Sequence, residues 1–236
     1  MREMRINLIE SIKRTPAIES FRFALKERLD FTAGQFLQVI FDEFNKDNKE
    51  LNKYLSFSSS PTKEYIEFTK RLSDSQFSQR LKNLKTDDEI LIKAPLGSCV
   101  FKDEYKKIGF LIGGIGITPV ISVIEYIVEE KLDTDVVLLY SNKIEEDIAF
   151  RKELDYWQSA NRNIKVVYTV TDCEPKGASC VLGRIDKNLF TSRVDDYEKR
   201  MFFIFGPPKM VEAMENLCLD TGCDSKNIKI ENFIGY

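Results

Sequence analysis

The chain has 236 residues, enough for one large domain or two small ones, and its 43% hydrophobic and 31% charged residues describe a globular rather than a disordered protein. Lys and Arg number 35 against 38 Asp and Glu, a formal net charge of -3, so no nucleic-acid partner is expected. The chain contains no histidine, which excludes every mechanism that needs imidazole as a base, a proton shuttle or a metal ligand.

The first hundred residues contain short runs of β-branched and aromatic residues separated by polar turns, which is typical of antiparallel strands. We expect strands at Phe36–Phe41, Lys53–Ser59 and Tyr65–Thr69, a helix from Ser78 to about Leu84, and a last strand at Glu89–Lys93. This order predicts a small antiparallel β-barrel with one capping helix.

Beyond residue 104 the pattern changes to alternating strands and helices. The expected strands are Ile108–Ile112, Val136–Tyr140, Ile164–Val170, Met201–Phe205 and Ile228–Ile230. The expected helices are Pro119–Glu130, Asp147–Ala160 and Lys209–Thr221. The alternation predicts a Rossmann-like α/β domain with a parallel sheet, and places the two domains at residues 1–103 and 104–236.

One segment has the length of a membrane span, because Ile108 to Ile124 is a run of 17 uncharged residues. Four glycines and Pro119 interrupt this run, which favours a strand, a glycine turn and a helix over a span.

The cysteines are five in number and never form a CxxC pair or an iron–sulfur spacing, so we expect free thiols and no metal site: Cys99, Cys173, Cys180, Cys218 and Cys223. An iron–sulfur cluster would therefore have to sit on another chain. The N-terminus lacks the apolar stretch of a signal peptide, and we expect a cytoplasmic protein.

The strongest chemical motif is Gly113–Pro119, Gly-Gly-Ile-Gly-Ile-Thr-Pro, where a predicted strand meets a predicted helix. Glycines let the backbone approach an anion, Thr118 is expected to cap the helix and Pro119 fits its first turn, so the motif suits a pyrophosphate. A tight turn with glycines for packing is the alternative. A second turn, Phe205–Lys209, favours the nucleotide, because ligands of such sheets bind at the carboxyl ends of strands.

The first half holds a matching set of polar residues. Lys53–Pro61 is a strand dense in serine, and Gln76–Gln79 opens the predicted helix. These features indicate a second ligand, although an ordinary edge strand and a plain N-cap at Ser78 would also explain them.

Together these residues resemble the ferredoxin–NADP reductase family of flavoproteins over nearly the whole chain. Gly34–Phe36 is similar to the family's Gly-Gln-Phe, and Lys53–Pro61 to its Arg-x-aromatic-Ser-x-x-Ser-x-Pro. The resemblance implies an FAD-binding barrel. It assigns these residues to FAD: Lys53, Tyr54, Leu55, Ser56, Phe68, Thr69, Lys70, Gln76, Phe77 and Ser78.

The second half continues the resemblance. Pro95–Gly97 is similar to the motif that closes the barrel domain, and Gly113–Pro119 matches the family's Gly-Gly-x-Gly-x-Thr-Pro in full. Glu231–Phe233 resembles the family's terminal Glu-x-aromatic. The resemblance places Phe233 or Tyr236 over the flavin. It assigns these further residues to cofactor binding, on the NAD(P) side: Gly113, Gly114, Gly116, Thr118, Pro119, Thr171, Asp172, Gly206, Pro207, Pro208 and Tyr236.

Three positions depart from the family pattern. Lys53 stands where the family has an arginine on the flavin diphosphate, which keeps the charge and loses the bidentate fork. Leu55 replaces the aromatic residue that lies against the flavin ring, unless neighbouring Tyr54 substitutes for it. Phe205 replaces the cysteine that many members carry before the second turn.

The resemblance implies that hydride passes from NAD(P)H to FAD and that electrons then pass singly to a carrier protein such as a ferredoxin, chemistry that needs no histidine. Ser56 is the hydroxyl expected near flavin N5, Glu231 a proton relay, and Phe233 an aromatic residue of the catalytic site.

The nicotinamide choice depends on Thr169–Asp172, where NADP-selective members tend to carry Ser-Arg. Asp172 would repel a 2′-phosphate and accept a hydrogen bond from a 2′-hydroxyl, so NADH is preferred over NADPH.

Two other interpretations remain. The chain would also suit a flavin electron-transfer subunit of a larger complex, although such members carry a C-terminal cysteine cluster where this chain has only Cys218 and Cys223. A flavin-free nucleotide-binding regulator is the third, because Lys53 and Leu55 depart from the flavin motif.

Overall fold

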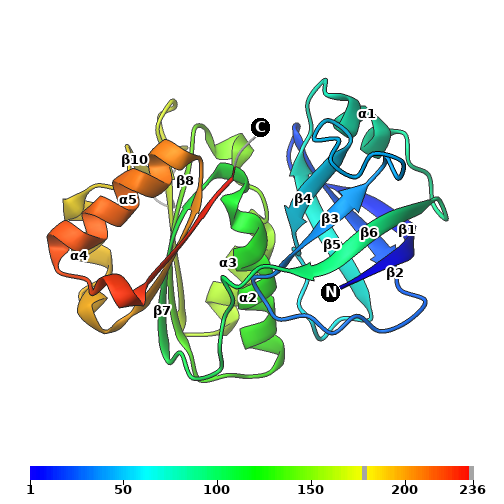
Figure 1. Ribbon diagram of the computed structural model, residues 1–236. Helices are drawn as coiled ribbons and strands as arrows, with labels where there is room; N and C mark the ends of the chain where they lie inside the picture. Colours follow the sequence, from blue (N-terminus) through cyan, green and yellow to red (C-terminus); the bar gives the residue numbers. More distant parts are fainter. Residues whose placement is uncertain (177–179, 234–236) are drawn as a thin grey trace. The chain divides into compact units, whose positions relative to one another are not determined.

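The computed structural model describes residues 1–176 and 180–233, which form two compact units. The first unit contains residues 1–101 and 118–129, and the second contains residues 102–117 and the chain from 130 onward. Each unit is built on a six-stranded sheet in the part of the chain described (Figure 1).

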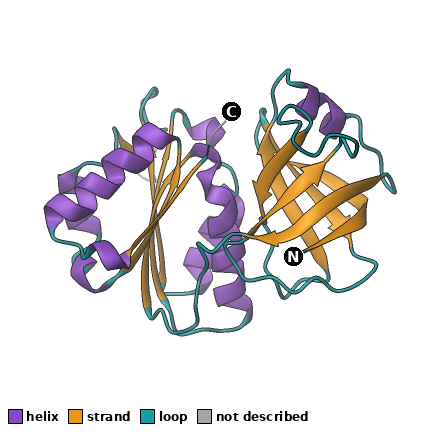
Figure 2. Ribbon diagram, in the orientation of Figure 1, coloured by secondary structure: helices purple, strands orange, loops and turns teal. Residues whose placement is uncertain are grey.

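The first unit is a nearly closed antiparallel barrel with strand order β4-β3-β6-β1-β2-β5 (Figure 2). Its strands are β1 (Arg2–Lys13), β2 (Ile18–Ala24), β3 (Phe36–Ile40), β4 (Asn52–Ser56), β5 (Tyr65–Arg71) and β6 (Glu89–Leu96). Alternate side chains fill the barrel, among them Phe21, Phe23 and Phe68, as the period of a half-buried strand requires. An isolated bridge between Phe57 and Phe68 joins the two edges, and α1 (Gln76–Lys82) is the helix predicted ahead of the last strand of the barrel.

The second unit is a parallel sheet of order β10-β9-β8-β7-β11-β12, as the alternating pattern predicted. Its strands are β7 (Lys107–Gly113), β8 (Asp135–Asn142), β9 (Ile164–Val170), β10 (Cys180–Leu182), β11 (Met201–Gly206) and β12 (Ile228–Asn232). Its helices are α3 (Arg151–Ala160), α4 (Lys187–Arg193) and α5 (Pro208–Thr221). Side chains of α4 and α5 pack with β7, β8 and β11 in one apolar cluster.

The expected strands are all present, with ends that differ by a few residues. The prediction for α3 is wrong at its start, because Glu145–Asp147 forms a separate 3-10 turn and Phe150 takes the left-handed conformation (φ 59°) before the helix begins. The expected elements did not include β1, β2, β10 or α4, of which β10 and α4 are too short for a clear periodicity.

The uncharged run from Ile108 to Ile124 forms β7, a 3-10 turn and α2 (Ile117–Glu129). Among the described residues, no helix combines the length and apolar character needed to cross a membrane. Helix α2 packs with the barrel and belongs to the first unit.

Candidate functional site

Strand β4 carries the serine-rich motif and pairs with β3 in the register Lys53–Val39, Tyr54–Gln38, Leu55–Leu37 and Ser56–Phe36. Leu55 packs against the barrel core, whereas Tyr54 is 63% exposed and meets Phe36 edge to face. The exposed aromatic surface of this strand is therefore that of Tyr54. Ser56 is buried at the end of the strand, and within the described part of the chain its hydroxyl makes no hydrogen bond.

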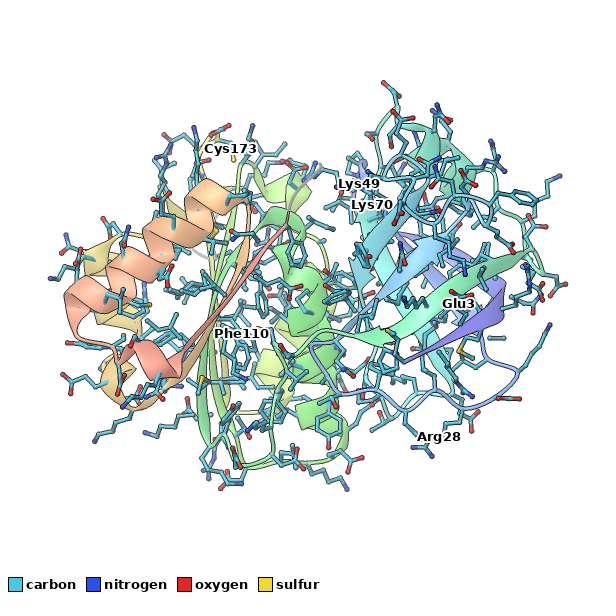
Figure 3. The ribbon with its side chains drawn as sticks, viewed as in Figure 1. Glu3, Arg28, Lys49, Lys70, Phe110 and Cys173 are labelled. Atoms are coloured by element: carbon cyan, nitrogen blue, oxygen red, sulfur yellow. The ribbon has the colours of Figure 1, made fainter. Side chains whose placement is uncertain are left out.

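Lys70 on β5 is the residue that best tests the fit of an anionic cofactor (Figure 3). It is 8% exposed, and among the described residues its Nζ donates only to the carbonyl of Arg71, at 3.1 Å. Burial, aided by the positive charges of Lys53 and Arg71, lowers the pKa of Lys70. A buried ammonium group with no carboxylate partner in the described chain is costly unless an anion neutralises it. The residues present therefore fit the diphosphate of FAD.

The hydroxyl of Thr69 on β5 and that of Ser58, in the serine-rich motif before β5, serve the barrel itself. Thr69 Oγ1 lies 2.7 Å from both Ser20 Oγ and Ser58 Oγ, and Ser58 also donates to Glu67. Phe68 is fully buried in the core. Because the Phe68 ring is buried and the Thr69 hydroxyl is already hydrogen-bonded, any contact of these two residues with a cofactor would come from their main-chain atoms.

Helix α1 begins earlier than the sequence predicts. Ser75 is its N-cap and accepts from the Ser78 N–H, so the alternative in which Ser78 is a plain N-cap is wrong. Ser78 is fully buried and its hydroxyl is shared with Ser73 and Ser75. Phe77 packs on Phe41, which leaves Gln76 as the exposed side chain of the three assigned residues.

The first nucleotide turn, Gly114–Gly116, is a 3-10 turn directly after β7. Gly114 has a φ of +53°, and a Cβ at this position would meet only open space. At Gly116 a Cβ would lie 2.4 Å from the Phe205 carbonyl oxygen. Gly116 is therefore a packing glycine, and Gly114 is the one whose backbone a phosphate could approach.

Thr118 lies inside the first turn of α2 rather than before it, and Pro119 follows it in the same turn. The expectation that Thr118 caps the helix is wrong, because the chain already turns from Gly114 and the helix starts at Ile117. Thr118 is buried, and Pro119 occupies the first turn as predicted, where it needs no hydrogen-bond donor.

The second turn lies beside the first. Strands β11 and β7 are neighbours, and a Cβ on Gly206 would lie 3.3 Å from the Gly113 nitrogen. Pro207 is the N-cap of α5 and Pro208 its first residue, and both are exposed. The two turns thus form one edge of the second unit, at the carboxyl ends of the strands.

Asp172 lies at the same edge, after β9. Its N–H donates to the Lys143 carbonyl at 2.8 Å, and its carboxylate accepts from the Thr171 hydroxyl at 2.7 Å. The carboxylate is exposed. One of its oxygens accepts from the Thr171 hydroxyl, and the other stays available for a hydroxyl of a ligand.

Glu231 and Phe233 lie next to the second turn. Glu231 pairs with Phe205 across β12 and β11, and burial raises its pKa to about 7. The Phe233 N–H donates to the Gly206 carbonyl at 2.9 Å, and its ring stacks on Phe205 at 6.4 Å. Tyr236 lies outside the described residues.

Sequence reasoning missed two residues at this edge. Asn142 ends β8 and is 6% exposed, yet neither amide atom has a hydrogen-bond partner in the described chain. Its signal was a polar residue at the end of an apolar strand. Met210 contacts both glycine turns, and no sequence signal pointed to it.

Comparisons with known proteins cover most of the chain. Residues 5–101 match the family of oxidoreductase FAD-binding domains, and residues 110–216 match that of oxidoreductase NAD-binding domains. The solved ferredoxin NADP+ reductase from Neisseria gonorrhoeae, with bound FAD and NADP, superposes with a TM-score of 0.82 at 22% identity, covering 98% of this chain and 99% of that one.

Two curated relatives are both NADH-cytochrome b5 reductases. NADH-cytochrome b5 reductase 1 of Dictyostelium discoideum is 31% identical over 213 residues, which cover 88% of this chain and 74% of that protein. NADH-cytochrome b5 reductase 2 of Mycosarcoma maydis is 31% identical over 179 residues, covering 73% and 50%. The chain therefore spans only about half the length of the second relative.

Proposed function

Because the chain belongs to the ferredoxin–NADP reductase-like family and is an FAD-dependent NAD(P)H reductase, we propose that it oxidises NADH and delivers electrons singly to a haem protein of the cytochrome b5 type. The observation that carries the proposal is the 31% identity to a NADH-cytochrome b5 reductase over 88% of this chain. A one-electron carrier agrees with the sequence-based expectation. A haem carrier replaces a ferredoxin as the preferred acceptor.

On the flavin side, the residues of the barrel bind and orient. Lys70 and Lys53 would neutralise the diphosphate, and the exposed ring of Tyr54 would lie against the cofactor in place of the missing aromatic at Leu55. The unpartnered hydroxyl of Ser56 would donate to or accept from flavin N5. When bound, FAD supplies the exchange between hydride and single electrons.

On the nucleotide side, the backbone of Gly114 would approach the pyrophosphate, and Pro207 and Pro208 would hold the second turn rigid. Glu231, with a pKa of about 7, would hold or release a proton at its carboxyl at neutral pH. Phe233 would keep its place through Phe205 and the Gly206 carbonyl.

The nucleotide preference rests on Asp172. An exposed carboxylate at the end of β9 would accept a hydrogen bond from the 2′-hydroxyl of NADH and repel the 2′-phosphate of NADPH. The name of the Dictyostelium relative supports the same choice.

The test is an anaerobic titration of the FAD-loaded protein with NADH and then NADPH, followed by flavin absorbance, with cytochrome b5 or a ferredoxin added afterwards. We expect NADH to bleach the flavin and cytochrome b5 to be reduced faster than ferredoxin. Asp172→Asn should lower the NADH to NADPH ratio of kcat/KM about tenfold, while Glu174→Gln in the same loop should not. A flavin bleached only by NADPH, or rapid transfer to ferredoxin alone, would contradict the proposal.

A further inference from the structure

Gly113 is the first glycine of the nucleotide motif, yet its backbone does not need glycine. Its φ of -120° and ψ of 125° lie in the ordinary strand region, which every residue type adopts. What excludes a side chain is one neighbour. A Cβ on Gly113 would lie 2.7 Å from Met210 Sδ and 3.6 Å from Met210 Cε, with Pro207 Cδ at 3.4 Å.

Gly206, in the second turn, faces the same sulfur. A Cβ on Gly206 would lie 3.0 Å from Met210 Sδ. Met210 lies in the first turn of α5, where its N–H donates to the Pro207 carbonyl at 2.9 Å, and its side chain packs against the apolar cluster of the second unit. One thioether therefore fills the space that two glycines leave, one from each nucleotide turn.

The register between β7 and β11 ends one residue before these glycines. Its last pair is Phe205 with Ile112, although Gly113 still pairs with Ser141 of β8 and Gly206 with Asn232 of β12. No β7–β11 pair joins the two glycines to each other, so side-chain packing contributes to how the two turns stand relative to each other. Methionine suits this position, because its unbranched, polarisable side chain adapts to irregular gaps.

We propose that Met210 is a positioning residue for nucleotide binding: its thioether fixes the spacing of the two turns, and Gly113 is glycine to admit Met210 rather than to admit the nucleotide. The inference rests on the proposed function, because it assumes that both turns hold NADH. The inference gives the three glycines of the motif different roles. Gly113 leaves room for Met210, Gly114 leaves its backbone open to a phosphate, and Gly116 leaves room for the Phe205 carbonyl.

The three glycines differ in whether a second substitution can rescue them. The obstacle at Gly113 is the end of a flexible side chain, so removing that side chain removes the obstacle. The obstacle at Gly116 is the Phe205 carbonyl, and Gly114 needs its left-handed conformation, so neither depends on Met210.

The experiment is a double-mutant cycle on the FAD-loaded protein, with Gly113→Ala, Met210→Ala and the double variant. Binding of NAD+ is measured by calorimetry, and kcat and KM for NADH are measured separately. We expect Gly113→Ala to weaken NAD+ binding about tenfold in the wild-type background and to have little further effect once Met210 is alanine. Met210→Ala alone should raise KM more than it lowers kcat, and Met210→Leu should lose less.

Gly114→Ala and Gly116→Ala are the matched controls and should stay defective with or without Met210. An equal loss from Gly113→Ala in both backgrounds would show that Gly113 faces the nucleotide, and wild-type affinity in Met210→Ala would show that Met210 positions nothing. Either result overturns the inference. A wild-type protein that binds no NAD+ would instead overturn the proposed function.

A measurement on the wild-type protein tests the inference even where the glycine variants do not fold. With methyl-labelled methionine, NAD+ should shift the Met210 resonance, assigned from Met210→Leu, while Met4 in the barrel should not respond. A Met210 resonance that stays unchanged when NAD+ is bound would contradict the inference.

Discussion

Burial on β12 turns the carboxyl of Glu231 into an acid that titrates near neutral pH, since its pKa is raised to about 7 from an ordinary value of 4.5. Lys70 is the corresponding cation, with a pKa lowered by burial and by two neighbouring positive charges. In both residues the fold disfavours the charged form. Such groups concentrate at functional sites, and both occur here among the residues that the sequence assigned to cofactor binding or catalysis.

The raised pKa of Glu231 predicts a pH dependence of stability. Between pH 4.5 and about 7 the folded protein keeps a proton that the unfolded chain has released, so the free energy of unfolding falls as the pH rises through this window. Well above pH 7 this contribution to the free energy of unfolding is completely lost. We expect the Tm of the wild type to fall more between pH 5 and pH 8 than that of Glu231→Gln.

Glu64→Gln is the control for this measurement, because Glu64 is exposed on the barrel. Its profile should follow the wild type. Parallel profiles for Glu231→Gln and the wild type would mean that the Glu231 carboxyl ionises as it does in water.

Helix α2 is attached to the loop between β4 and β5 of the barrel by a few polar contacts. Glu125 accepts from the Ser60 N–H at 2.7 Å and lies 3.3 Å from Lys63 Nζ, and Lys63 also pairs with Glu129. Burial raises the pKa of Glu125, while the Ser60 N–H and the Lys63 charge lower it. The loop between β4 and β5 therefore holds the helix that follows the first nucleotide turn.

These contacts predict unequal effects of two substitutions. Glu125→Ala leaves the Ser60 N–H without its acceptor and should destabilise the protein by about 1–3 kcal/mol in urea unfolding. Glu125→Gln keeps an oxygen acceptor and removes a partly buried charge, so it should cost less. Glu130→Ala, at an exposed position after the helix, should be neutral. Equal losses in the two Glu125 variants would mean that its charge, not its acceptor oxygen, holds α2.

At the scale of the whole molecule, the two candidate sites draw on different units: Lys70 belongs to the first and Gly114 to the second. We therefore expect binding of the two cofactors to be separable. Lys70→Gln should weaken FAD binding about tenfold, measured by reconstituting the apoprotein, and leave NAD+ affinity unchanged. Gly114→Ala should do the reverse.

Lys13→Gln, which changes an exposed lysine of the barrel, is the control for lost charge and should alter neither affinity. If Lys70→Gln lowered the affinity for both cofactors equally, the assignment of Lys70 to the flavin alone would be wrong. The expected domain boundary near residue 104 remains a prediction. Lys70→Gln and Gly114→Ala test whether the two cofactor sites are independent, not where the boundary lies.

The sequence by itself determined the order of the elements, the barrel followed by a parallel sheet, and the two glycine turns at strand ends, because periodicity and glycine placement are local properties of the chain. It also singled out Lys70, Glu231 and Asp172 as candidate site residues, which remains a prediction. Its errors at Thr118 and Ser78 concern helix starts, which shift by a few residues when a neighbour provides the cap.

Only the tertiary structure decided what these residues meet. Gly113 and Met210 are 97 residues apart in the sequence and are brought together by neighbouring parallel strands. Ser60 and Glu125 are 65 residues apart and are brought together by packing of α2 on the barrel. Contacts of this kind follow from the path of the whole chain, since burial, and with it the pKa of Lys70 or Glu231, depends on atoms far away in sequence. For that reason the three glycines of the motif could be predicted from the sequence, whereas only the fold shows that Gly113 faces Met210, Gly116 faces the Phe205 carbonyl and Gly114 faces open space.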